Sequence, residues 1–75
     1  MNIKLLSVYR ISRKPGLKAK IKINKKVITV HCGKTVQVRD SYAHIWGIEI
    51  EDKANGTTSG RVNLTYEKES IVLEI

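Results

Sequence analysis

The chain has 75 residues, with 14 lysines and arginines against seven acidic residues and a formal net charge of +7 at pH 7. A chain of this length can bury one modest core and has little room left for a substrate pocket, so we expect a single domain over residues 1–75 with no catalytic residues and no cofactor. Its one cysteine, Cys32, excludes an intrachain disulfide and suits a reducing compartment. Because no apolar stretch approaches the length of a membrane span, we expect a cytoplasmic protein without membrane contact.

The charges are segregated along the chain. Residues 1–39 contain eleven basic residues and no acidic one, whereas residues 40–75 contain all seven acidic residues and only three basic ones. The two parts therefore carry formal charges of +11 and −4. An asymmetry of this size indicates a charged interaction surface, provided that the strands of the two parts do not interleave completely.

The clearest structural pattern is in residues 17–23, where apolar and basic residues alternate strictly. Alternation at period two predicts a half-buried strand with one face in the core and the other in solvent. The apolar members are Leu17, Ala19, Ile21 and Ile23, and the lysines between them are Lys18, Lys20 and Lys22.

Residues 3–11 predict a strand that precedes this one. Leu5 and Leu6 are adjacent and would lie on opposite faces, which indicates either a bulge near Leu6 and Ser7 or a strand buried on both sides. The segment Arg13-Lys14-Pro15-Gly16 predicts a type II turn, with the proline as the first central residue and the glycine as the second.

After a turn at residues 24–26, residues 27–32 and 36–38 are expected to form a hairpin. A three-residue loop at residues 32–34 would place Val30 opposite Val36 and Ile28 opposite Val38, and facing apolar pairs stabilise a sheet. Residues 40–44 are expected to be a polar connection or a short turn of helix.

The rest of the chain predicts three further strands. Trp46, Ile48 and Ile50 occupy the apolar phase of one strand, so we expect the tryptophan in the core. A loop over residues 53–60 with its reversal at Asn55-Gly56 leads into a strand at 62–66 and, after a turn at 67–69, a last strand at 71–75. We therefore predict an all-β, small single-domain antiparallel barrel or sandwich of six to seven short strands.

Motifs for chemistry are weak. Gly33-Lys34-Thr35 matches the end of a phosphate-binding loop, but Ile28 stands where that motif needs a glycine, and a β-patterned run follows. A zinc site would need His31, Cys32 and His44 together with a carboxylate such as Asp40, but adjacent residues of a strand point to opposite faces, so we expect no metal site. Glu49 and Glu51 share a strand face that we expect to be exposed and solubilising.

The basic surface is the remaining candidate site, and the partner we expect first is nucleic acid, DNA or RNA, in a regulatory or accessory role. Lysine and arginine side chains bind phosphates without reading sequence, and an exposed tyrosine can stack on a base. Tyr9 is a second stacking candidate. The predicted nucleic-acid-binding residues are Arg10, Arg13, Lys14, Lys18, Lys20, Lys22, Lys25, Lys26, Arg39 and Tyr42.

Two other hypotheses account for part of the pattern. Oppositely charged faces, or an exposed strand edge at residues 27–32 or 71–75, would suit a protein partner or a homo-oligomer, as in an inhibitor or accessory protein of a phage or mobile element. Alternatively, lysines on an edge strand would only guard against sheet-to-sheet aggregation. That alternative explains the lysine row better than it explains the absence of acidic residues from residues 1–39.

Overall fold

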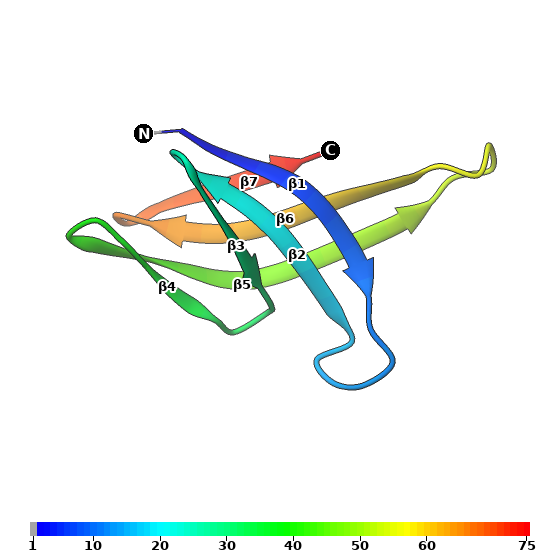
Figure 1. The fold of residues 1–75 in the computed structure, drawn as a ribbon, viewed down its shortest axis with the longest axis horizontal. Helices are drawn as coiled ribbons and strands as arrows, with labels where there is room; N and C mark the ends of the chain where they lie inside the picture. The colour runs from blue at the N-terminus through cyan, green and yellow to red at the C-terminus, as the bar shows by residue number, and fades with distance from the viewer. Residues whose placement is uncertain (1) are drawn as a thin grey trace.

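The protein is built from seven β-strands arranged in two antiparallel sheets (Figure 1). The computed structural model describes residues 2–75 and contains no helix in that range. The strands are β1 (Ile3–Arg10), β2 (Leu17–Ile23), β3 (Lys26–Val30), β4 (Thr35–Val38), β5 (Ser41–Asp52), β6 (Thr58–Tyr66) and β7 (Glu69–Glu74). One sheet has the order β1-β2-β3 and the other the order β4-β5-β6-β7. The predicted all-β class and strand number are confirmed, as two packed sheets and not as a closed barrel.

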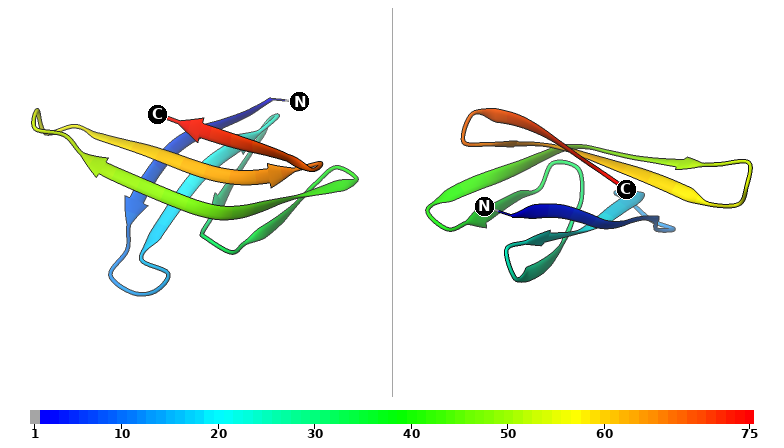
Figure 2. Two further views of the ribbon diagram at one scale, coloured as in Figure 1. Left: turned by 180° about the vertical axis from the view of Figure 1, so that it is seen from behind. Right: turned by 90° about the horizontal axis from the view of Figure 1, so that it is seen from above.

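The core lies between the two sheets, which form two layers in Figure 2. Each sheet contributes the apolar half of its alternating strands, and both halves point inward. Ile21, Val30, Ile45, Val62 and Leu64 are the largest side chains that are fully buried. The other buried aliphatic residues are Leu5, Ala19, Ile23, Val38, Ala43, Ile48 and Leu73.

The pairing of β1 with β2 confirms the bulge, the first of the two alternatives for this strand. Leu5 lies opposite Ile21 and Ser7 lies opposite Lys20, so Leu6 is the extra residue. The type II assignment of the following turn is wrong, because the Gly16 N–H donates to the Arg13 carbonyl at 2.9 Å. Pro15 is therefore the second central residue, after a cis Lys14–Pro15 bond, which is the position that a cis proline takes in turns.

The predicted hairpin between residues 27–32 and 36–38 is wrong. β3 pairs with β2, so that Val30 faces Ala19, and β4 pairs with β5, so that Val36 faces Ala43. Residues 31–34 cross from one sheet to the other, held where the Gly33 N–H donates to the Ile45 carbonyl at 2.7 Å. The apolar residues of β3 and β4 contact the same core from opposite layers. Their alternation therefore identifies which face of each strand is buried, but not which strand it pairs with.

Two expectations for the following segment are also wrong. Residues 41–44 are not a connection but the start of β5, which follows a two-residue turn in which Arg39 has a positive φ of 56°. Trp46 is not in the core: this residue is 51% exposed, whereas the preceding Ile45 is fully buried. A second register shift, between Ile45 and Gly47, makes Trp46 the extra residue of a bulge, so that it points outward although Ile48 points into the core.

The later elements follow the prediction more closely. The β5–β6 loop is shorter than expected, residues 53–57, because Thr58 already pairs with Asp52. Its reversal contains Gly56 at a φ of 84°, and the Gly56 N–H donates to the Lys53 carbonyl at 3.0 Å. The last turn contains Glu67 and Lys68, both at positive φ, and leads into β7 as predicted.

Gly60 permits the close approach of the two layers, because it lies on the inner face of β6 against Val8 of β1. A Cβ at this position would come within 2.7 Å of the Val8 Cβ. We expect Gly60→Ala to lower the free energy of unfolding by about 1–3 kcal/mol, the usual cost of an overpacked core, measured by urea denaturation.

The double variant Val8→Ala with Gly60→Ala should lose less stability than the sum of its two single variants, because Val8→Ala removes the valine methyl carbon that lies nearest to the new Cβ, although the contact between the two Cβ atoms remains. Gly47→Ala is the matched control, since the nearest atom there is the Asn63 Nδ2 at 3.1 Å, the end of a movable side chain. A Gly60→Ala protein as stable as the parent would contradict the packing described here.

Candidate nucleic-acid interface

The outward face of the β1-β2-β3 sheet presents four lysines. Lys18, Lys20 and Lys22 point outward because Ala19, Ile21 and Ile23, which alternate with them, are buried in the core. Lys4 of β1 lies directly opposite Lys22 and joins the same face. We call Lys4, Lys18, Lys20 and Lys22 the lysine face.

The neighbours of the lysine face on the adjacent strands are uncharged. Lys20 lies between Ser7 of β1 and Thr29 of β3, and Lys18 lies opposite Tyr9. Within residues 2–75, every ion pair involves Arg10 or Arg61, so none of the four lysines is neutralised by a carboxylate. Like charges directly opposite each other in a sheet are destabilising, so the Lys4 and Lys22 pair would be relieved by an anion.

Four further predicted basic residues lie at the two ends of this face. Arg13 and Lys14 lie in the turn between β1 and β2, next to the Lys18 end of the row. Lys25 lies in the turn between β2 and β3, and Lys26 begins β3 at the Lys22 end. All four are exposed. The structure thus brings seven of the ten predicted residues to the lysine face and its two ends.

The other three predicted residues do not join the lysine face, although Arg10 is the last residue of β1 in the same sheet. Arg10 is paired with Asp52 at the end of β5, with its Nη2 3.0 Å from Oδ2 and its Nη1 3.3 Å from Oδ1. Both side chains are more than half exposed, so the pair contributes at most about 1 kcal/mol, but it occupies the guanidinium. Arg39 lies in the turn between β4 and β5. Tyr42 lies on the outward face of β5, in the other sheet, and not in a loop.

Lys4 and Tyr9 also belong to this face, although Lys4 was not predicted as a site residue and Tyr9 was named only as a second stacking candidate. Their spacing of five residues would place them on opposite faces of a regular strand. The extra residue Leu6 reverses the phase between them, so both point outward. The adjacent Leu5 and Leu6 were the signal that could have placed Lys4 beside Lys22.

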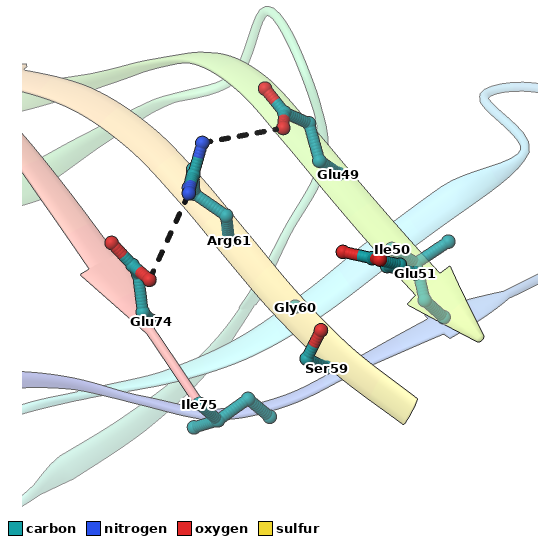
Figure 3. Close-up of a pocket in the computed structure, with 8 residues that line it drawn as sticks. All are labelled: Glu49, Ile50, Glu51, Ser59, Gly60, Arg61, Glu74 and Ile75. Carbon is teal, nitrogen blue, oxygen red and sulfur yellow. Dashed lines mark ion pairs between the residues drawn. The ribbon is translucent and has the colours of Figure 1, made fainter. Parts of the chain in front are cut away.

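All seven acidic residues lie on the four-stranded sheet or its turns. Figure 3 shows Arg61 of β6 between Glu49 of β5 and Glu74 of β7, at 3.7 and 3.8 Å, beside a shallow depression of about 160 Å³. One guanidinium is thus shared by two carboxylates, so this surface remains negative. Glu49 and Glu51 are exposed, as expected.

The residues considered for metal binding do not gather. The Cys32 thiol donates to the Trp46 carbonyl at 3.2 Å, and His44 Nδ1 lies 3.0 Å from the Thr35 hydroxyl. Residues 2–75 contain no group of three or more side chains suited to hold a metal ion. Burial and the neighbouring Glu67 raise the pKa of Tyr66 above its ordinary value of 10.0, so this hydroxyl carries no charge at neutral pH.

Comparison of the chain with protein-family models, curated proteins and solved structures found no match. Over the described residues, no helix is long and apolar enough to cross a membrane. The assignment of this face therefore depends on its geometry and charge.

The opposed Lys4 and Lys22 give a prediction for stability. At low ionic strength Lys4→Gln should raise the free energy of unfolding by about 0.2–1 kcal/mol, because it removes the cross-strand repulsion. The gain should shrink as the screening length falls from about 30 Å at 0.01 M to about 3 Å at 1 M salt. Urea denaturation at both salt concentrations measures it.

Lys53→Gln, in the β5–β6 loop, is the control, since no lysine lies across a sheet from that position. A stability gain for Lys4→Gln that is equal at both salt concentrations would show that the two ammonium groups do not repel each other.

Proposed function

We propose that the protein binds nucleic acid non-enzymatically through the sugar-phosphate backbone, with the lysine face as the contact surface. The observation that supports this most is the placement of four unpaired lysines on one outward sheet face, with every acidic residue on the other sheet. When a lysine contacts a phosphate, it displaces condensed counterions into the solution. The entropy gained by the released ions is the main source of affinity for such contacts.

The position of the lysines argues against a purely protective role. Lysine rows that prevent aggregation lie on edge strands, where they block pairing with another sheet. β2, however, is the central strand of its sheet, flanked by β1 and β3. Its backbone groups are already paired on both sides, so Lys18, Lys20 and Lys22 guard no free edge.

The surface favours binding without strong sequence preference. The four lysines contact phosphates and read no base edges. Tyr9, beside Lys18, is the aromatic residue placed to stack on an unpaired base. Tyr42 cannot act together with the lysine face, because it lies on the outward side of the opposite sheet. A cytoplasmic location would suit this function, since nucleic acid is accessible there and the exposed thiol of Cys32 stays reduced.

The salt dependence of binding tests the proposal. Random single- and double-stranded DNA and RNA should bind at about 0.05 M salt, and the affinity for duplex DNA should fall with a slope of about −0.9 per phosphate contacted. Lys20→Gln should weaken binding to all sequences alike and make the slope shallower by about one. Fluorescence anisotropy at increasing salt measures both quantities.

A charge-reversal series separates the face from net charge. The triple variant Lys18→Glu, Lys20→Glu and Lys22→Glu should abolish binding. The matched control, Lys34→Glu, Lys53→Glu and Lys68→Glu, changes the net charge equally but leaves the lysine face intact, and it should still bind. Far-UV circular dichroism verifies that both variants fold. Absence of binding by the parent at about 0.05 M salt, or equal losses in the two variants, would contradict the proposal.

A further inference from the structure

A groove separates the two edge strands β3 and β4. The strands are joined by residues 31–34 and diverge from that connection in Figures 1 and 2, without pairing with each other. The groove between them has a volume of about 420 Å³. The residues that line it are Ile23, Asn24, Lys25, Lys26, Ile28, Val36, Gln37, Val38 and Arg39.

The floor of the groove is aliphatic. Ile28 of β3 and Val36 of β4 are only half-buried, although both pack against the core. Covering these side chains would remove apolar surface from water, at about 25 cal/mol per Å².

The rim of the groove is positively charged. Lys25 and Lys26 lie on one side and Arg39 on the other, and all three are exposed. None of the nine lining residues is acidic. A ligand that fits both the floor and the rim therefore carries aliphatic groups and negative charge together.

The backbone of the two edges indicates the shape of that ligand. β3 is paired only with β2 and β4 only with β5 over residues 2–75, so each strand has one side with unpaired N–H and C=O groups. Such edges bind extended peptides as an added strand. β3 has five residues, a length of about 17 Å, which matches a peptide of five to seven residues.

We propose that the groove binds an extended acidic peptide segment of another protein, which adds as a strand to β3. Alternate aliphatic side chains of the peptide cover Ile28 and Val36, and the carboxylates at the peptide end beside the β2–β3 turn face Lys25, Lys26 and Arg39. A second copy of this chain is disfavoured as the occupant. Its β7 edge has acidic and aliphatic residues, but two copies that each carry +7 repel each other.

The probe for the test is the labelled peptide Glu-Val-Glu-Val-Glu-Val-Glu, without nucleic acid. We expect it to bind and to shift the amide resonances of residues 24–30 and 36–39 in ¹⁵N–¹H spectra. Peptides in which serine replaces valine, or lysine replaces glutamate, should bind at least tenfold more weakly. Equal binding of the serine peptide, or no shifts at β3 and β4, would overturn the proposal.

Backbone methylation tests strand addition directly. In an added strand, the backbone N–H groups of every second residue donate hydrogen bonds to the edge strand. N-methylation of one set of residues, either the three valines or the glutamates, should therefore abolish binding. N-methylation of the remaining set should leave binding intact. Retention of binding by both methylated peptides would overturn the proposal. Dodecanoate producing the same shifts, with no binding of the peptide, would show that the occupant is an aliphatic anion.

Variants separate this groove from the lysine face. Lys25→Ala with Arg39→Ala should raise the Kd for the peptide at least tenfold, and Arg13→Ala with Lys14→Ala, two cations in the opposite turn, should leave it unchanged. The lysine-face variant Lys18→Gln, Lys20→Gln and Lys22→Gln should keep peptide binding, so the two proposals can fail independently. Self-association, seen as faster sedimentation at increasing protein concentration, together with shifts of the β3 and β7 amide resonances in the absence of peptide, would instead identify a second copy as the occupant.

Discussion

The burial of β2 against the four-stranded sheet is the constraint on which the surface depends. Ala19 and Ile21 are fully buried and Ile23 nearly so, and each fixes the lysine beside it in solvent. A shift of β2 by one residue would expose these aliphatic side chains and bury three ammonium groups, each at a cost of several kcal/mol. The outward lysines are thus a direct consequence of core packing, and their common orientation needs no interaction of their own.

The two layers also separate the charges of the chain. Strand order keeps β1, β2 and β3 together, so most of the basic segment forms one layer, and the acidic later segment forms the other layer together with β4. The observed contacts between charges of the two layers are confined to the exposed Arg10 and Asp52 pair within residues 2–75. A molecule with one positive and one negative side orients itself in the field of a polyanion before contact, which favours fast association.

Alternation in the sequence was sufficient to predict the strand class and the outward row on β2, and it gave the bulge near Leu6 as one of two alternatives. It was insufficient where the partner strand or a second bulge decides the outcome. Val30 and Val36 looked like hairpin partners because both are apolar, but apolar residues of opposite layers produce the same pattern. Trp46 continues the alternation of Ile48 and Ile50, but the extra residue in β5 reverses the phase, and the adjacent apolar Ile45 and Trp46 are the sequence signal of this bulge. The groove, which joins Arg39 to Lys25 and Lys26, depends on the layer crossing at residues 31–34 and has no local signature.

The β5–β6 hairpin extends beyond the rest of the molecule and ends in residues 53–57, visible at the far right of Figure 1. This tip is closed by its own turn, with the Asn55 side chain accepting from the Thr57 N–H at 3.1 Å, and all five of its residues are exposed. Exposed tips of this kind tolerate insertions. A fluorophore or a fused domain attached there would leave the lysine face and the groove unobstructed. The tip of the β5–β6 hairpin is therefore a suitable attachment site for immobilising the protein.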